Sequence, residues 1–445
     1  MSQLGLKEAV AMALGGMIGG GIYSAFGLVV AISGTVAWLA WAVAGLVALG
    51  AGYSYIKLNE LVDERGGAPT YIESLVGNRT LAGITGWTLL FGYVGSIALY
   101  AYAFSRFFAE LFGRLHLLSI PVANVVSVLL IFAFVGLNLV GVSETGTAED
   151  VLTFVKVAII GLFGLWGVVY ATGGHTLRLG LGQVASVSPI MGAAMSFVAF
   201  QGWQLLLYDQ SQFSDPDEQI PKAVLVSIPA ATLLYILVAL TTVALLPLAE
   251  IAVAPEVSLL YAGIQFMGPI GALVIGLSAL FSTASAVNAT LFSSALFSNR
   301  LIDMGVLPDR LGSDSDDDDG EAIPGTVVVV IGVLSSAFAV FGSLMSITSF
   351  ASLAFIATFG GMSYLAWDRR DDINDIVAPI PLVGLAGCVL FFPLLLYNLF
   401  ITSPATFWLV IIIGVVVLGT ELLYFEREPI EQTLPWMSHS RGDES

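Results

Sequence analysis

Charged side chains are scarce in this chain of 445 residues, because Asp, Glu, Lys and Arg together make up only 11% of it. Soluble proteins usually contain roughly a quarter of charged residues. Hydrophobic residues instead make up 57%. Water therefore cannot be the main solvent of the folded chain, and the composition predicts an integral membrane protein whose main partner is the lipid bilayer.

Cysteine, histidine and lysine are also rare, which argues against disulfides, metal sites and nucleotide-binding loops. Cys388 is the single cysteine, so no internal disulfide can form, and we interpret it as a small buried hydrophobe. None of the four lysines follows a glycine, so the chain has no phosphate-binding loop of a nucleotide-driven pump. The three histidines lack Cys or His neighbours at metal spacing. We expect no metal, no cofactor and no nucleic acid.

Paired catalytic groups are missing as well. No apolar run combines Ser, His and Asp, or two carboxylates, into a nucleophilic or acid and base set. We therefore do not expect an enzyme.

Long apolar runs fill most of the chain. A helix needs about 20 apolar residues to cross a bilayer core about 30 Å thick. The runs are continuously apolar, without the alternation of barrel strands, so they predict an all-α polytopic membrane fold. The first run is too long and too rich in glycine for a signal peptide, and we expect it to be retained. About twelve spans are predicted, near residues 7–34, 35–61, 80–112, 121–141, 149–171, 189–209, 221–247, 257–300, 324–342, 344–367, 379–401 and 404–425.

The distribution of Lys and Arg predicts the orientation in the membrane. Cytoplasmic loops carry an excess of these residues. With the N-terminus inside, eleven of the fifteen are cytoplasmic, three (Arg106, Arg114 and Arg178) are outside, and Lys156 lies within a span. The sequence thus predicts a multi-pass cell-membrane protein with both termini cytoplasmic. The net charge of −18 comes largely from loops, including an acidic run at 314–321, and from the tail at 426–445.

A glycine cluster interrupts the first span. Five of the seven residues from 15 to 21 are glycine, and the cluster continues into Ile22 and Tyr23. Gly15 with Gly19, and Gly16 with Gly20, have the spacing of close helix packing. The other interpretation is that the helix unwinds here, because glycine tolerates non-helical dihedral angles and leaves the backbone accessible. Unwinding would expose amides to a carboxylate and carbonyls to an ammonium, which together suit a zwitterion.

A second candidate break lies in the sixth span, where Gly202 stands among the aromatic residues Phe197, Phe200 and Trp203. Breaks in spans one and six occupy corresponding positions in a five-plus-five inverted repeat. The prediction is a ten-helix core over residues 1–367, built from repeats at about 7–171 and 189–367. Two appended helices over 368–425 and the acidic tail follow.

Three fragments together carry a resemblance to a known family. They are the run from Gly15 to Tyr23, the set Glu60, Gly66, Gly67 and Tyr71, and the span-six run followed by Asp215, Pro216, Ile220, Pro221 and Lys222. The combination resembles the amino acid permeases of the amino acid, polyamine and organocation (APC) superfamily. The resemblance covers spans one to ten and implies alternating access around a central substrate site.

The resemblance also implies roles for particular residues. It assigns the substrate carboxylate to the amides of Met17, Ile18, Gly19, Gly20 and Gly21. It assigns the ammonium to carbonyls near Ala13 and Leu14 and to those of Phe197 and Ala199, and it makes Phe200 and Trp203 an aromatic gate and pocket wall beside Gly202. Many relatives have an acidic residue where this chain has Gln204, which argues against a cationic substrate.

Lys156 is an ionisable residue inside the fifth predicted span, which by itself suggests a functional role. The simpler alternative is that the side chain reaches to the interface. In some proton-dependent relatives, a lysine in this span occupies the place of a sodium ion, and Lys156 resembles that residue. Burial disfavours the charged ammonium, so reversible protonation near neutral pH becomes feasible. Ser282, Thr283 and Ser285 in span eight leave a sodium site open as the alternative.

The sequence therefore predicts a secondary active transporter for an amino acid, coupled to protons. A polyamine or organic-cation transporter or exchanger is one alternative. A channel or a non-transporting solute sensor on the same scaffold is another.

Overall fold

A computed structural model describes residues 4–62, 66–113, 116–117, 120–140, 146–174, 177–208, 210–312 and 324–425 of the chain. The predicted acidic run at 314–321 and the tail at 426–445 lie outside these ranges. The described part is almost entirely helical, which confirms the predicted fold class. Its one sheet is a two-stranded antiparallel pair.

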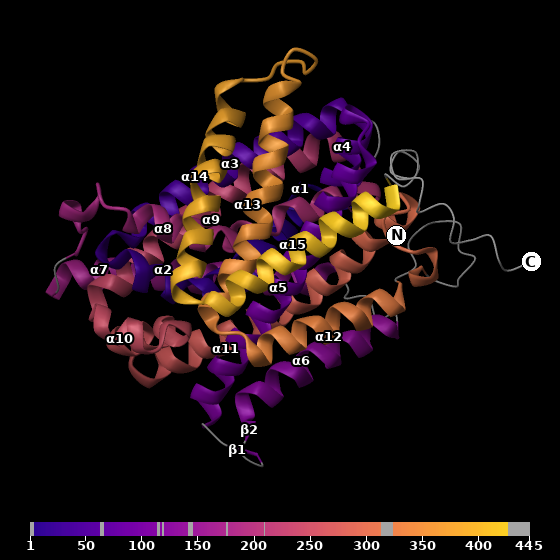
Figure 1. The fold of residues 1–445 in the computed structure, drawn as a ribbon. Helices are drawn as coiled ribbons and strands as arrows, with labels where there is room; N and C mark the ends of the chain where they lie inside the picture. Colours follow the sequence, from indigo (N-terminus) through magenta and orange to yellow (C-terminus); the bar gives the residue numbers. More distant parts are fainter. Residues whose placement is uncertain are drawn as a thin grey trace, which may run out of the picture.

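Residues 6–174 contain the elements up to α7, and residues 181–425 contain the remainder (Figure 1). The elements up to α7 are α1 (Leu6–Gly16), a π-helical segment (Met17–Gly21), α2 (Ile22–Ser33), a 3-10 turn (Gly34–Val36), α3 (Ala37–Leu61), α4 (Ala68–Val76), α5 (Arg79–Phe112), β1 (His116–Leu117), β2 (Ile120–Pro121), α6 (Val122–Leu139) and α7 (Gly146–Gly174).

After α7, four 3-10 turns and one pair of 3-10 segments lie between the helices. The elements are a 3-10 turn (Leu181–Gln183), α8 (Ser188–Met195), two 3-10 segments (Ser196–Phe200 and Trp203–Leu207), a turn (Gln210–Gln212), α9 (Pro216–Leu245), α10 (Leu248–Val253), a turn (Pro255–Val257), α11 (Ser258–Asp303), a turn (Asp309–Leu311), α12 (Gly325–Phe341), α13 (Leu344–Asp368), α14 (Pro379–Thr402) and α15 (Pro404–Phe425).

The helices match the predicted spans closely. Within the described residues, nine helical stretches are long and apolar enough to cross a membrane, and the stretch Leu6–Leu61 contains both of the first two predicted spans. Two shorter apolar helices, Gly325–Phe341 and Pro404–Gly419, coincide with predicted spans nine and twelve. The protein is thus a polytopic helical membrane protein.

The α11 helix is bent near one end. Gly268 has a φ of 61° and a ψ of −150°, and Pro269 follows it. Glycine adopts this left-handed conformation without steric cost, and proline removes a helical N–H donor, so the two together bend the helix. Residues of α11 before the bend line one cavity together with residues of the short helix α10.

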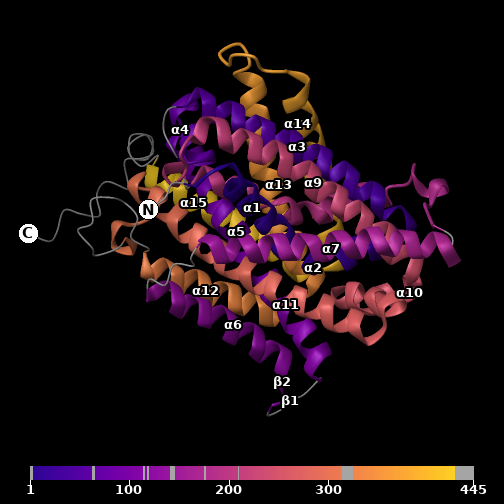
Figure 2. The same cartoon turned by 180° about the vertical axis from the view of Figure 1, so that it is seen from behind.

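The two interrupted elements lie in the middle of the bundle. The π-helical segment packs against the 3-10 segment Ser196–Phe200 and against α5, α7 and α11. That 3-10 segment in turn packs against α3 and α13. Helices α6, α12 and α15 lie outside this group, and Figures 1 and 2 both show α6 alongside α12.

At the end of the bundle near the N-terminus, hydrogen bonds join segments that are far apart in the sequence. Leu4 pairs with the turn after span six, because its N–H donates to Gln212 O (2.8 Å) and its carbonyl accepts from Ser214 N–H (3.0 Å). The guanidinium of Arg79 donates to Met304 O (2.6 Å), and that of Arg369 donates to Leu75 O (2.7 Å). These bonds join α5 and α4 to the ends of α11 and α13.

Candidate central substrate site

Span six is broken as the sequence predicted. After the 3-10 segment Ser196–Phe200, Gln201 is extended and Gly202 has a φ of 130°, which non-glycine residues rarely adopt. The break frees backbone groups that side chains then satisfy. The Val198 N–H donates to Ser352 Oγ of α13 (3.1 Å), and the Gly202 N–H donates to Gln204 Oε1 (2.7 Å).

Span one keeps a helical backbone, so the predicted unwinding is absent from this structure. Gly16, Met17, Gly21 and Ile22 all have right-handed helical dihedral angles, and Met17–Gly21 forms a π-helical turn. A π turn has hydrogen bonds of wider spacing than an α-helix, and such turns are frequent at functional sites. The discontinuity of span one is therefore a widened turn in the helix.

Close packing explains why the glycines hold a helix here. A Cβ atom on Gly16 would lie 2.7 Å from Gly202 Cα, and one on Gly21 would lie 2.6 Å from Ala199 Cα. A Cβ atom on Gly20 would lie 2.1 Å from the Tyr100 ring. These positions accept no side chain without movement of a neighbour. The small residues thus bring the two interrupted segments into backbone contact, which is the packing interpretation of the cluster.

One hydroxyl joins the two segments. The Tyr235 hydroxyl of α9 lies 2.7 Å from Met17 O and 2.9 Å from Ala199 O. A phenol has a single O–H donor, so the two carbonyl oxygens share it. Ala199 O is one of the carbonyls predicted to meet the substrate ammonium. Ala13 O and Leu14 O, two others in that prediction, accept the Met17 N–H within the helix.

The predicted aromatic residues are enclosed on all sides. Phe197, Phe200 and Trp203 are each 0% exposed. The Phe200 ring lies 5.3 Å from Tyr235, and the Trp203 ring lies 5.1 Å from Phe359 of α13. The remaining predicted residues, Met17, Ile18, Gly19, Gly20, Gly21, Ala199 and Gly202, are buried as well. The structure brings all ten together in one buried cluster.

Lys156 lies on α7, which packs against both α1 and the π-helical segment. Its side chain is only 2% exposed. Thr153, one turn earlier on the same helix, places its Oγ1 3.0 Å from the position of a Cβ on Gly15. The predicted coupling residue is thus beside the first interrupted segment, with its amine shielded from solvent.

The hydroxyls predicted as sodium ligands lie on α11, which packs against both the π-helical segment and α7. Thr283 Oγ1 donates to Ala279 O (2.7 Å). Ser282 is fully buried, and its Oγ has no hydrogen-bond partner within the described residues. The Ser282 carbonyl lies 3.4 Å from the position of a Cβ on Gly19. A buried hydroxyl without a partner needs an explanation, and a bound ion would supply one. The Ser282 hydroxyl therefore keeps sodium coupling as an alternative to proton coupling.

Three residues of this cluster were missed by the sequence reasoning. They are Tyr235, Ser352 and Tyr100, whose hydroxyl accepts a hydrogen bond from the Gln201 side chain. Polar groups within apolar spans are costly and mark functional positions, so the lone Tyr235 in an apolar run was the available signal. The sequence could not tell which neighbouring helix each hydroxyl faces.

Comparison with known proteins identifies the family. The model of the amino acid permease family matches residues 4–418. An uncharacterized protein of Methanocaldococcus jannaschii is 29% identical over 426 residues, covering 95% of both chains. The inner membrane transport protein YbaT of Escherichia coli is 27% identical, covering 92% of this chain and 93% of its own length. The serine/threonine exchanger SteT of Bacillus subtilis is 24% identical, covering 69% of each chain.

These matches confirm the family that the glycine run and the span-six motif indicated, and they extend over almost the whole described structure. The named relatives are transport proteins, which agrees with a transporter and not with an enzyme. The chain belongs to the amino acid permease family.

Proposed function

We propose that the protein is a secondary active transporter that moves an amino acid across the cell membrane by alternating access, coupled to protons. The observation that carries the proposal is the backbone contact between the two interrupted segments, where Tyr235 holds the carbonyls of Met17 and Ala199. Two carbonyl groups that share one hydroxyl donor can still bind a stronger hydrogen-bond donor. An ammonium group is such a donor, because it is charged and offers three N–H groups.

In this proposal the closed cluster is one stage of the cycle. A substrate would enter between the π-helical segment and Gly202, and the widened turn would open to present the amides of Gly19, Gly20 and Gly21 to the carboxylate. The ammonium would take over the carbonyls that Tyr235 now occupies. Phe200 and Trp203 would close over the substrate side chain, which favours a neutral amino acid.

Lys156 supports proton coupling through its position. Its amine lies away from solvent on the helix that touches α1 and the π-helical segment, so its charge would alter the packing of the first interrupted element. The alternative is sodium, held by Ser282, Thr283 or Ser285. We further propose that both termini are cytoplasmic, that residues 1–367 form the five-plus-five core, and that 368–425 are appended.

Two other functions remain as alternatives within this proposal. One is transport or exchange of a polyamine or another organic cation, although the cluster contains Gln204 and no carboxylate among its predicted residues. The other is a channel or a sensor. The relatives include a serine/threonine exchanger and a branched-chain amino acid permease, both of Bacillus subtilis, which supports an amino acid substrate.

Reconstitution into liposomes tests the proposal. Purified protein would be presented with a panel of labelled neutral, cationic and anionic amino acids and with a polyamine, under imposed proton or sodium gradients. A transporter gives saturable uptake and counterflow, whereas a channel conducts without saturation and a sensor binds without flux. Saturable uptake of a neutral amino acid that a proton gradient accelerates is the expected result.

A further inference from the structure

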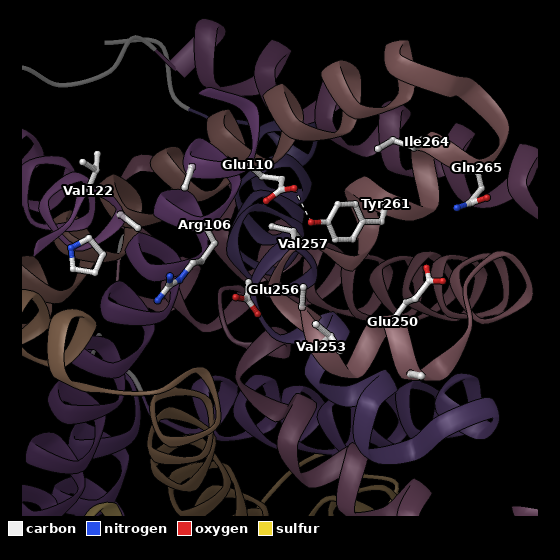
Figure 3. Close-up of a pocket in the computed structure, with 15 residues that line it drawn as sticks. Arg106, Glu110, Val122, Glu250, Val253, Glu256, Val257, Tyr261, Ile264 and Gln265 are labelled. Carbon is white, nitrogen blue, oxygen red and sulfur yellow. Dashed lines mark hydrogen bonds between the residues drawn. The ribbon is translucent and has the colours of Figure 1, made fainter. Parts of the chain in front are cut away.

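A cavity of about 850 Å³ lies outside the central cluster, between the ends of α5, α6, α10 and α11 (Figure 3). We call it the outer vestibule, and none of the ten predicted substrate residues or Lys156 lines it. Its walls include alanine and valine side chains together with four charged ones. The charged residues are Arg106, Glu110, Glu250 and Glu256.

The charges in the outer vestibule differ in how they are held. Glu110 accepts a hydrogen bond from the Tyr261 hydroxyl (2.6 Å), which fixes one carboxylate against the α11 wall. The Arg106 guanidinium lies over the Tyr102 ring, 4.5 Å from its centroid. Its Nε is shielded from solvent and lacks a hydrogen-bond partner among the described residues. Glu256 and Glu250 make no ion pair within that part of the chain.

This combination of charges suits one class of ligand. With three carboxylates and one guanidinium in the lining, an anion would meet net repulsion. A lone cation would be attracted by the carboxylates but would leave the Arg106 guanidinium without a counter-charge. A zwitterion offers a carboxylate to the guanidinium and an ammonium to the glutamates. The apolar wall at Val253 and Val257 suits a neutral side chain, and the volume lies within the range of small-molecule pockets.

We propose that the outer vestibule is a second, outer binding site for a neutral α-amino acid, with its carboxylate on Arg106 and its ammonium on Glu256 and Glu250. The proposal rests on the proposed function. The outer vestibule is well placed to communicate with span one, because the turn Pro255–Val257 in its wall also covers α2. Pro255 O lies 1.7 Å from the position of a Cβ on Gly27, six residues after the π-helical segment ends.

Initial uptake rates into liposomes test this site, with tritiated L-serine or L-leucine as the probe, whichever the wild type takes up. Arg106→Gln and Glu256→Gln each remove one vestibule charge. Arg178→Gln is the matched control, because Arg178 is exposed and does not line the cavity. Thermal unfolding of each purified variant checks that it is folded. If Arg106→Gln does not fold, Glu256→Gln alone decides the test.

The vestibule variants should raise KM roughly tenfold, the loss expected for one hydrogen bond to a charged group, with kcat within about twofold of the wild type. The effect should weaken at high salt, and external L-glutamate should inhibit Glu256→Gln more strongly than the wild type. Arg178→Gln should match the wild type. An unchanged KM in folded vestibule variants overturns the outer site alone, whereas a wild type that takes up no amino acid overturns the proposed function.

Discussion

The phenol oxygen of Tyr235 lies 2.7 Å from the carbonyl oxygen of Met17, and this bond joins α9 to the π-helical segment of span one. Because the same oxygen also reaches Ala199 O in span six, α9 holds both interrupted elements in one arrangement. A substrate ammonium at these carbonyls would have to displace the hydroxyl. Tyr235 is therefore expected to stabilise the closed cluster and to tune how readily it opens.

Removal of this hydroxyl gives the first prediction. Tyr235→Phe leaves two buried carbonyl oxygens without their donor, which costs about 1–3 kcal/mol of folding free energy. Uptake should fall about tenfold, since the segments lose their shared anchor. The matched control is Tyr53→Phe, which also removes a hydroxyl with two backbone partners, Asp375 O and Val377 N–H, but at an exposed site. Equal uptake by the two variants would contradict the anchoring role.

The glycine cluster gives the second prediction, because its members differ in the space around them. A Cβ on Gly19 would have its nearest neighbour at 3.4 Å, which is ordinary contact, whereas one on Gly20 would meet the Tyr100 ring at 2.1 Å. Gly20→Ala should therefore lower stability by about 1–3 kcal/mol through overpacking. Gly19→Ala should fold with a wild-type Tm and still lose most transport, because its methyl group blocks access to the backbone amides.

The measurements are thermal unfolding and liposome uptake for both glycine variants. Normal uptake by Gly19→Ala would leave the cluster with a packing role only. That outcome would remove the amides of this segment from the proposed carboxylate site.

The sequence predicted much of this architecture because apolar length and glycine content are local properties. The predicted apolar runs fall on helical segments of the described chain, and Gly202 breaks span six as its position among large aromatic residues suggested. The state of span one depended on tertiary packing. Five glycines allow either an unwound or a helical backbone, and the contacts of Gly16, Gly20 and Gly21 with neighbouring elements favour the helix in this arrangement.

Side chains contributed by distant helices could not be predicted in the same way. Tyr235 and Ser352 act on backbone groups of spans one and six, but each is far away in the chain from its partner. The outer vestibule likewise combines the end of α5 with α10 and the start of α11. Such sites depend on helix packing, which hydropathy alone does not determine.

Trp203 gives the third prediction. It packs against Tyr55 and Phe359 inside the bundle, whereas Trp408 on α15 is 57% exposed on the outer surface of the bundle. Trp203→Phe should weaken substrate affinity or slow closure, with KM raised severalfold, because the smaller ring leaves a gap in the proposed pocket wall. Trp408→Phe should match the wild type in uptake. Equal effects of the two changes on KM would exclude span six from the pocket.

The last prediction concerns Lys156, whose side chain is buried on α7 beside the first interrupted segment. Lys156→Met removes the charge with little change in length. If Lys156 carries the coupling proton, the variant should lose accumulation driven by a proton gradient while it still binds substrate at the separate backbone site. Wild-type uptake should vary with external pH, and this dependence should flatten in the variant. If the lysine only reaches toward the interface, uptake should barely change.

If sodium is the coupling ion, Lys156→Met should keep gradient-driven uptake. A substitution of Ser282, a candidate sodium ligand, is the matched test. Ser282 is fully buried on α11, and its carbonyl oxygen lies 3.4 Å from the position of a Cβ on Gly19. Uptake would be measured in liposomes against external pH, with sodium present and absent, for the wild type, Lys156→Met and Ser282→Ala. Proton coupling requires loss of gradient-driven uptake in Lys156→Met and near-normal uptake in Ser282→Ala. Sodium-driven accumulation that survives Lys156→Met but fails in Ser282→Ala would replace the proton with an ion bound at α11, because only the second change removes an oxygen ligand.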